Sequence, residues 1–216
     1  QSRINFTTCH LRVDTDAAVV ELIGLGAAPL TATTLAQLVR RSCDVRTADM
    51  LAEHGVGWFE EPLIPDALDD FVTLRNASRL PIAGGEVMTR RQSFLPFLSK
   101  GAFDIVQPDV TKVGGLSEQR RIIHMAQDFG VRYVGHGWNT ALGLAADLQL
   151  AAAVPNVDLV EYIAGSAYLD GILVDPFKLD ADGMLSIPAS PGLGVALDPD
   201  KIAQYTPNAE RLFSQS

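Results

Sequence analysis

The chain has 216 residues, of which 47% are hydrophobic, and a formal net charge of −9, so it can bury a sizeable core as one domain. It has no cluster of Lys and Arg of the kind that neutralises phosphates, so we expect neither nucleic acid nor an anionic membrane as a partner. The longest apolar stretch, residues 141–154, is interrupted by Asp147 and Gln149 and is too short to span a bilayer. A small molecule is the expected partner.

The chain contains two cysteines, Cys9 and Cys43. They give no disulfide framework and fit a reducing compartment, so we expect a cytoplasmic protein. The first residue is Gln1 rather than Met, and no signal-peptide pattern follows it. The sequence is therefore expected to be a processed or truncated product.

Near the N-terminus, residues 9–13 are predicted to form a strand and residues around 17–22 a helix. The next segment, residues 22–46, has little periodic pattern. It also has no acidic residue between Glu21 and Asp44, so no strand ending in a carboxylate is predicted there. We expect this atypical segment to be an insertion or a reading-frame error.

From residue 55 onward, short apolar runs alternate with amphipathic stretches, which is the pattern of βα units around a parallel sheet. The predicted strands are 57–60, 81–85, 103–107, 132–136 and 157–161, and the predicted helices are 67–78, 89–100, 116–129 and 140–153. After Glu161 the chain becomes rich in Pro and Gly. This predicts a return segment rather than another βα unit.

Five polar residues lie at or just after the C-terminal ends of these predicted strands: Glu60, Glu86, Asp109, His136 and Glu161. In a (β/α)8 barrel this edge of the sheet carries the active site, because every strand end points into one shared mouth. A single acidic residue after a strand is more often a helix N-cap or a solvated loop residue. Glu and His are not preferred caps, so five such residues predict a common site.

Four motifs surround these positions: Trp58-Phe-Glu-Glu-Pro62, Ala83-Gly-Gly-Glu86, Gln107-Pro-Asp-Val-Thr-Lys-Val-Gly-Gly115 and His136-Gly-Trp-Asn139. Glu86 lies 26 residues after Glu60, Asp109 lies 23 residues after Glu86, and His136 lies 27 residues after Asp109. In order and spacing the motifs resemble the strand-end signatures of the mandelate racemase group of the enolase superfamily. The resemblance extends over well over half of the chain.

The resemblance implies a Mg²⁺ site. Glu60 and Glu86 match the second and third metal ligands of the group, and hard carboxylate oxygens are what Mg²⁺ prefers. The first ligand of the group is an Asp that ends a strand. Asp14 is the candidate, because the segment from Leu11 to Asp16 is the stretch that resembles that part of the family.

The resemblance also implies catalytic roles. Asp109 and His136 match a hydrogen-bonded dyad in which the histidine takes the α-proton of a carboxylate and the aspartate orients it. Glu161 matches the carboxyl group that donates a proton or a hydrogen bond to the substrate carboxylate.

Three further residues are candidates for substrate binding, each beside an equally plausible structural role. Asp16 is either a contact to substrate or metal-bound water, or the N-cap of the predicted helix. Lys112 either contacts substrate or the metal-ligand carboxylates, or forms a buried ion pair that supports the barrel. Trp138 either lines the pocket or packs in the core.

The implied fold is α/β, a TIM-type (β/α)8 barrel. We expect a truncated barrel, with strands 3–8 present and the first two strands and the N-terminal capping domain missing. Residues 1–165 are then a partial barrel catalytic domain, atypical over residues 22–46, and residues 166–216 return toward the capping domain. A homo-oligomer is expected.

The expected activity is Mg²⁺-dependent dehydration of an acid sugar to a 2-keto-3-deoxy acid. Dehydration requires one good base and one acid, whereas a racemase or epimerase usually needs bases on both faces of the substrate. Two alternatives stay open. One is a racemase or epimerase of a 2-hydroxy acid, and the other is a catalytically silent fragment of such an enzyme.

Overall fold

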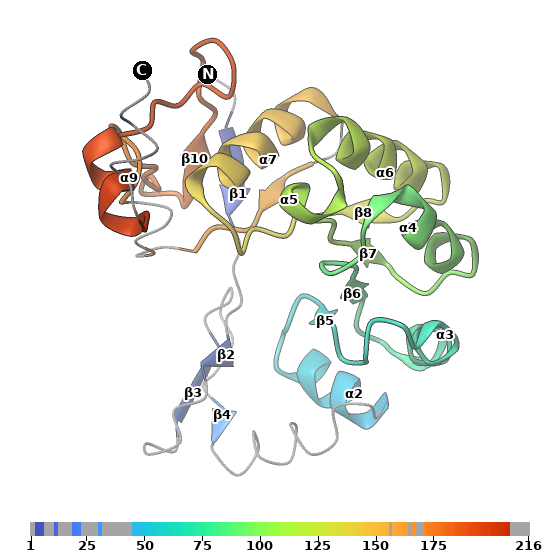
Figure 1. The fold of residues 1–216 in the computed structure, drawn as a ribbon. Coiled ribbons are helices and arrows are strands. Elements are labelled where there is room, and N and C mark those ends of the chain that lie inside the picture. Colours follow the sequence, from blue (N-terminus) through green and yellow to red (C-terminus); the bar gives the residue numbers. More distant parts are fainter. Residues whose placement is uncertain are drawn as a thin grey trace. The chain divides into compact units, whose positions relative to one another are not determined.

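A computed structural model describes residues 3–6, 11–12, 19–22, 30–31, 45–155, 157–163, 166 and 171–207. The chain divides into two compact units. We call Thr7–His136 the sheet unit, and Gln1–Phe6 together with Gly137–Ser216 the C-terminal unit. The elements of both are labelled in Figure 1.

The centre of the sheet unit is a parallel four-stranded sheet in the order β5-β6-β7-β8. The strands are β5 (Phe59–Glu60), β6 (Ile82–Gly84), β7 (Ile105–Val106) and β8 (Arg132–Tyr133). All residues of β6 and β7 are buried, as expected for parallel strands that are covered on both faces. Each strand lies within its predicted segment but is shorter than predicted.

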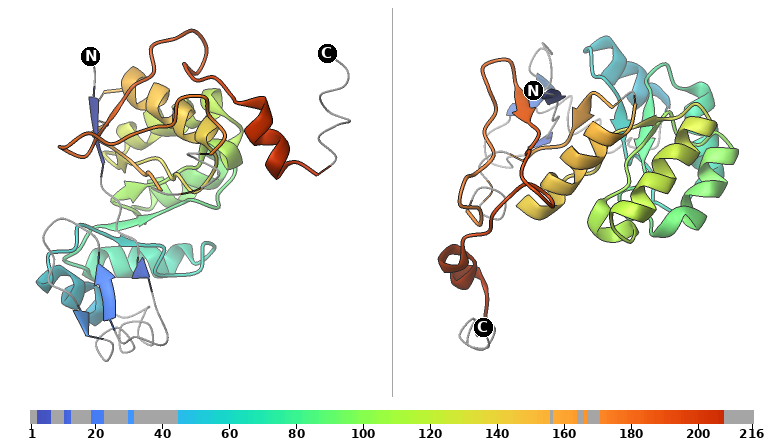
Figure 2. Two further views of the ribbon diagram at one scale, coloured as in Figure 1. Left: turned by 90° about the vertical axis from the view of Figure 1, so that its left-hand side faces the viewer. Right: turned by 90° about the horizontal axis from the view of Figure 1, so that it is seen from above.

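Helices follow the strands in alternation and cover one face of the sheet (Figures 1 and 2). α2 (Val45–Glu53) precedes β5, and α3 (Leu68–Ala77), α4 (Arg90–Ser99) and α6 (Leu116–Asp128) each follow a strand, with the short α5 (Val110–Val113) directly before α6. Neighbouring parallel strands need a crossover connection of this kind, which is usually a helix. The predicted βα alternation of this unit is therefore confirmed.

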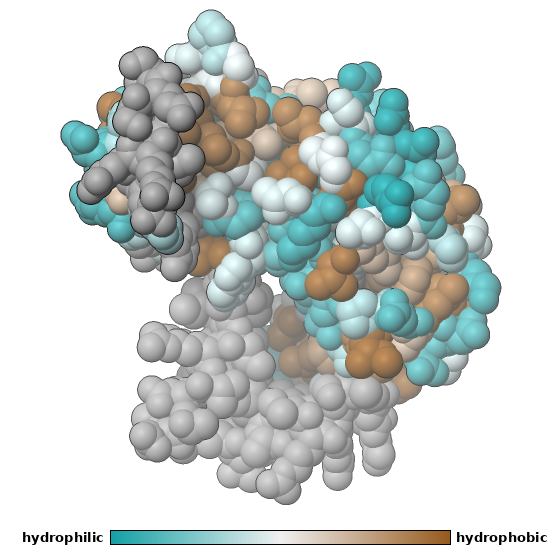
Figure 3. Space-filling view, viewed as in Figure 1, coloured by the Kyte–Doolittle hydropathy of each residue, from teal (hydrophilic) through white to brown (hydrophobic). Residues whose placement is uncertain are grey.

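Three aromatic rings fasten α3 and α4 to the sheet. Phe103, two residues before β7, lies 5.1 Å from both Phe71 of α3 and Phe97 of α4, measured between ring centroids. Edge-on and stacked contacts at this separation stabilise a core beyond the area that they bury. On the opposite, outward surface over α4 and α6, hydrophilic residues predominate and hydrophobic ones are isolated (Figure 3).

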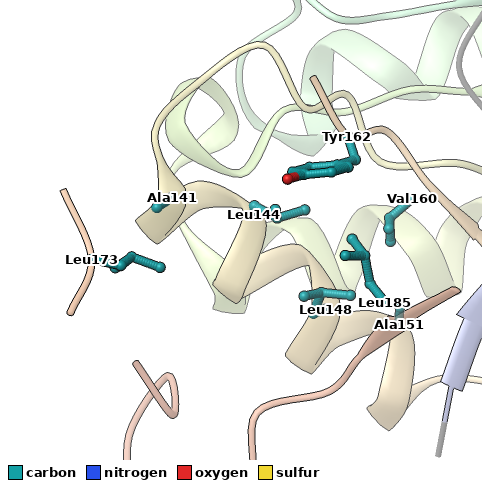
Figure 4. Close-up of a cluster of buried hydrophobic side chains, with 8 residues drawn as sticks. All are labelled: Ala141, Leu144, Leu148, Ala151, Val160, Tyr162, Leu173 and Leu185. Carbon is teal, nitrogen blue, oxygen red and sulfur yellow. The ribbon is translucent and has the colours of Figure 1, made fainter. Parts of the chain in front are cut away.

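The C-terminal unit has its own small sheet, in the order β10-β1-β9. β1 (Arg3–Phe6) runs parallel to β9 (Leu159–Val160) and antiparallel to β10 (Met184–Ser186). α7 (Ala141–Ala153) carries apolar residues at helical spacing that pack on this sheet (Figure 4), and the cluster comprises Ala141, Leu144, Leu148, Ala151, Val160, Tyr162, Leu173 and Leu185. The last described helix of this unit is α9 (Pro199–Tyr205).

The N-terminal part of the sheet unit differs from the prediction. β2 (Leu11–Arg12) lies inside the predicted strand 9–13, but β3 (Val19–Leu22) is a strand where a helix was predicted around 17–22. The β-branched Val19 and Val20 favour a strand, and β3 finds antiparallel partners on both sides, β2 and β4 (Leu30–Thr31). Residues 23–29 and 32–44 lie outside the described residues, so the predicted insertion over 22–46 stays a prediction.

The longest described helices, α6 and α7, have 13 residues each. No helix among the described residues combines the length and the apolar character that crossing a membrane requires.

Candidate active site

The four predicted site residues of the sheet unit lie at one edge of the parallel sheet. Glu60 is the last residue of β5, and Glu86, Asp109 and His136 follow β6, β7 and β8 within three residues. Because the strands are parallel, these positions share the C-terminal edge, where active sites of such sheets form.

His136 is held between two carboxylates. Its Nδ1 lies 2.8 Å from Asp109 Oδ2, and its Nε2 lies 3.1 Å from Glu86 Oε2. The His136 side chain is 5% exposed and the Asp109 side chain 0% exposed, so water does not compete for their contact. A carboxylate at Nδ1 fixes the ring and its tautomer, which leaves Nε2 as the nitrogen that exchanges a proton.

Asp109 is fixed by several donors. Its Oδ1 accepts hydrogen bonds from Thr111 N at 2.8 Å and Thr111 Oγ1 at 2.6 Å, and Lys112 Nζ lies 3.6 Å from its Oδ2. Burial raises the pKa of Asp109, but hydrogen bonds from His136 and Thr111 outweigh burial and lower that pKa to about 2. Asp109 is therefore ionised at neutral pH, and it caps α5 as well as orienting His136.

Lys112 belongs to the same charge cluster. Its Nζ lies 3.6 Å from Asp109 Oδ2, but its side chain is 36% exposed, so the roles predicted for Lys112 stay predictions. Its charge also lowers the pKa of Glu86. The larger cause of that lowered pKa is the hydrogen bond from His136, which outweighs the effect of burial on Glu86.

Glu60 is exposed to solvent but one of its oxygens is held firmly. Glu60 Oε2 accepts hydrogen bonds from Trp58 Nε1 at 2.9 Å and Gln107 Nε2 at 2.8 Å. Sequence reasoning did not single out Gln107. The signal was its place at the start of the Gln107-Pro-Asp motif, directly after β7.

Glu61 is a second residue that sequence reasoning left aside. It has a positive φ of 41°, and its Oε1 accepts a hydrogen bond from Gly85 N at 2.6 Å. Burial raises the pKa of Glu61, and the negative charges of Glu86 and Glu60 raise it further, against the hydrogen bonds from the backbone of Gly85 and Glu86. The charges of Glu86 and Glu60 therefore oppose ionisation of Glu61, in addition to its burial.

The glycines of the Ala83-Gly-Gly-Glu86 motif make room for this arrangement. A Cβ on Gly84 would lie 2.9 Å from Phe103 Cε1 and 3.1 Å from Glu61 Oε1. Gly85 has a φ of +113°, which side chains other than glycine rarely adopt. The motif therefore lets the chain turn from β6 to Glu86 while Glu61 reaches the Gly85 amide.

The carboxylates of Glu60 and Glu86 are suitable donors for a divalent cation, and a cation would offset the repulsion that raises the pKa of Glu61. Within the described residues, no group of three or more His, Cys, Asp or Glu is arranged to hold a metal ion. The predicted third ligand, Asp14, and the predicted substrate contact, Asp16, lie outside the described residues.

Glu161 and Trp138 belong to the C-terminal unit. Glu161 follows β9, and its Oε2 accepts a hydrogen bond from Gly137 N at 2.6 Å. A Cβ on Gly137 would collide with the backbone oxygen of Glu161, so this close approach requires glycine. Trp138 is 65% exposed, so it is not a core residue, and its pocket-lining role stays a prediction. The convergence of Glu161 with the other four residues stays a prediction.

Comparison with known proteins places the chain in a family. The model of the enolase C-terminal domain-like family matches residues 9–201, and the chain belongs to this family. It is 35% identical over 170 residues to a D-galactarolactone cycloisomerase of Agrobacterium fabrum, covering 74% of this chain and 45% of that protein. It is 32% identical over 170 residues to a D-xylonate dehydratase of Haloferax volcanii, covering 79% and 41%. The chain thus spans less than half the length of these curated relatives.

Comparison with solved structures leads to the same superfamily. The 3,6-anhydro-D-galactonate cycloisomerase from Zobellia galactanivorans matches with a TM-score of 0.70 and 32% identity, over 77% of this chain and 47% of that one. The predicted superfamily and the α/β class are confirmed, and the neighbours are barrel enzymes of this superfamily. The absence of two strands and a cap stays a prediction.

Proposed function

We propose that this member of the enolase C-terminal domain-like family removes the proton α to the carboxylate of an acid sugar and, with Mg²⁺, dehydrates the sugar to a 2-keto-3-deoxy acid. The observation that carries the proposal is the 2.8 Å contact between His136 and Asp109, two buried side chains at the C-terminal edge of the sheet. Relatives named as acid-sugar dehydratases support the substrate class.

Glu60, Glu86 and Asp14 are the residues proposed to hold Mg²⁺. When bound, the ion supplies positive charge that stabilises the negative charge developing on the substrate carboxylate oxygens. Such a charge would also offset the part of the raised Glu61 pKa that the charges of Glu86 and Glu60 cause.

His136 is the proposed base. Asp109 accepts the hydrogen of Nδ1 and keeps the Nε2 lone pair available for the proton on C2 of the sugar. Because hydrogen bonds hold the pKa of Asp109 at about 2, its charge is present when His136 becomes positive and stabilises the protonated ring. Nε2 must leave Glu86, which lies 3.1 Å away, and give up the hydrogen that it donates there before its lone pair can take this proton.

Elimination breaks two bonds of the acid sugar. The C2–H electron pair becomes the C2–C3 double bond as His136 takes the proton, the C3–O bond breaks, and a protonated group of the site gives its proton to the departing hydroxyl, which leaves as water. The resulting enol tautomerises to the 2-keto-3-deoxy acid. Glu161 is the proposed acid that donates a proton or hydrogen bond to the substrate carboxylate, with Lys112, Asp16 and Trp138 as the proposed substrate contacts.

A cycloisomerisation is the second candidate, because three of the matches are named cycloisomerases. It can start with the same loss of the C2 proton to His136. The group that leaves C3 is then a ring oxygen, which stays attached to the product, so no water is lost. The same dyad serves both reactions, and the substrate decides between them.

A product screen tests the proposal. The full chain is incubated with a panel of acid sugars and their lactones, with Mg²⁺ or with EDTA, and products are identified by mass and NMR. Mg²⁺-dependent formation of a 2-keto acid that is lighter than the substrate by one water molecule supports dehydration. A product of unchanged mass with an opened or closed ring supports cycloisomerisation. Inversion at C2 alone would mean a racemase, and no conversion of any substrate would mean a silent chain.

A further inference from the structure

Glu60 has two unlike oxygens. Oε2 accepts hydrogen bonds from Trp58 Nε1 and Gln107 Nε2, at 2.9 Å and 2.8 Å. Among the described residues none donates to Oε1, and the side chain is exposed. A carboxylate held in this way has one oxygen fixed by the protein and presents the other oxygen for binding.

Gln107 is the buried member of this pair of donors. It is 3% exposed, and its backbone N–H donates to Gly84 O at 2.9 Å, which fixes its place beside β6. Its side chain reaches past the end of β6 to Glu60, 47 residues earlier in the chain.

The packing of Gln107 does not explain its amide. Gln107 Oε1 is buried and accepts no hydrogen bond from any residue that the structure describes. Burying an unsatisfied acceptor costs stability, and an apolar side chain of the same length would avoid that cost. The amide is also fixed in orientation, because turning it over would place Oε1 against the Glu60 carboxylate.

We propose that Gln107 is a positioning residue for Mg²⁺ binding, which fixes Oε2 of Glu60 so that Oε1 is presented to the cation. This inference rests on the proposed function, in which Glu60 is a metal ligand. It accounts for both polar atoms of the buried Gln107 amide. Among the described residues, Nε2 donates to Glu60 and Oε1 accepts no hydrogen bond.

Isothermal titration of the full chain with Mg²⁺ tests the proposal. The variant is Gln107→Met, which keeps the length of the side chain and removes the amide. We expect the Mg²⁺ dissociation constant to rise by about tenfold, as for other partners of metal ligands. The melting temperature of the Mg²⁺-free chain should stay equal or rise, because the unsatisfied oxygen is gone.

The matched control is Gln119→Met. Gln119 is also a buried glutamine whose Oε1 is unsatisfied among the described residues, but its Nε2 donates to Tyr133 Oη at 2.7 Å and to Pro108 O at 3.2 Å, and not to a predicted ligand. Removing its amide takes this donor from both buried acceptors, which costs more than removing the unsatisfied oxygen gains. This variant should lower the melting temperature and leave Mg²⁺ affinity unchanged. A purely structural Gln107 would behave in the same way as this control.

Two outcomes overturn the inference. Wild-type Mg²⁺ affinity in Gln107→Met, while Glu60→Ala loses binding, would remove the positioning role and leave the proposed metal site standing. Wild-type affinity in Glu60→Ala, or no Mg²⁺ binding by the unaltered chain, would remove the metal site and the inference with it. If Gln107→Met does not fold, Gln107→Leu is measured in its place against the same expectations.

Discussion

Asp109 and Glu61 are acidic residues in the same sheet unit, but their surroundings move their pKa values in opposite directions. The pKa of Asp109 is lowered to about 2, because donors from His136 and Thr111 outweigh its burial. The pKa of Glu61 is raised, because burial and the neighbouring charges of Glu86 and Glu60 outweigh two backbone donors. Hydrogen-bond donors of the protein therefore stabilise the charge of Asp109 in the His136–Asp109 dyad. At Glu61, beside the proposed metal ligands Glu60 and Glu86, burial and the neighbouring negative charges oppose ionisation.

The largest expected effect is on the dyad. Asp109→Asn should lower the rate of C2 proton exchange by about 10³-fold or more, because an amide neither fixes the His136 tautomer nor balances its charge. NMR of an acid sugar in deuterated buffer measures this rate. Asp104→Asn is the matched control, since Asp104 precedes β7 and bonds Arg75 and Ile82 N instead. Equal losses in both variants would show a general effect on the fold.

The pH dependence of stability gives the next effect. Because the pKa of Asp109 falls from 3.8 to about 2 on folding, the unfolded chain binds its proton more readily than the folded chain. The stability that this provides, about 2 kcal/mol, is complete above about pH 4 and is lost as pH falls toward about 2. Urea unfolding of Asp109→Asn should lack this loss. A parallel decline in both proteins would contradict it.

Among the proposed metal ligands, Asp14→Asn should weaken Mg²⁺ binding by at least about tenfold, which is about 1.4 kcal/mol. A third carboxylate adds a charge-assisted ligand to the two of Glu60 and Glu86, and Mg²⁺ requires several fixed oxygens. Isothermal titration of both forms measures the difference. Equal affinities would exclude Asp14 as a ligand.

The smallest expected effect is that of Glu61 on stability, and this effect depends on pH in the opposite direction to that of Asp109. A raised pKa means that the folded chain holds the Glu61 proton more readily, so this stability is present at low pH and is lost as pH rises from 4.5 through the raised value. With EDTA present, Glu61→Gln should therefore gain stability relative to the unaltered chain as pH rises. A gain as pH falls would mean that the backbone donors outweigh repulsion.

The βα pattern could be predicted from residue 55 onward because each unit is local. An apolar run followed by an amphipathic stretch specifies a strand and its helix, and parallel order then brings Glu60, Glu86, Asp109 and His136 to one edge. The same logic fails for β1 and β10, which pair across most of the chain. No local pattern records such a distant partner.

The site was predictable in its residues but not in its contacts. The motifs indicated Glu60 and Asp109, whereas the roles of Gln107 and Glu61 depend on three strand ends meeting. The helix predicted around residues 17–22 failed for a related reason, since β3 is stabilised by strands on both sides rather than by its own periodicity.

His136, oriented by Asp109, is the proposed base that removes the proton from C2. The direct test is deuterium incorporation at C2 of a bound acid sugar by the unaltered chain and by His136→Asn, at equal Mg²⁺ and with matching circular dichroism. Asn keeps a similar polar shape but cannot take up the proton. The account predicts incorporation by the unaltered chain and none by the variant, and incorporation by the variant at nearly the unaltered rate would contradict it.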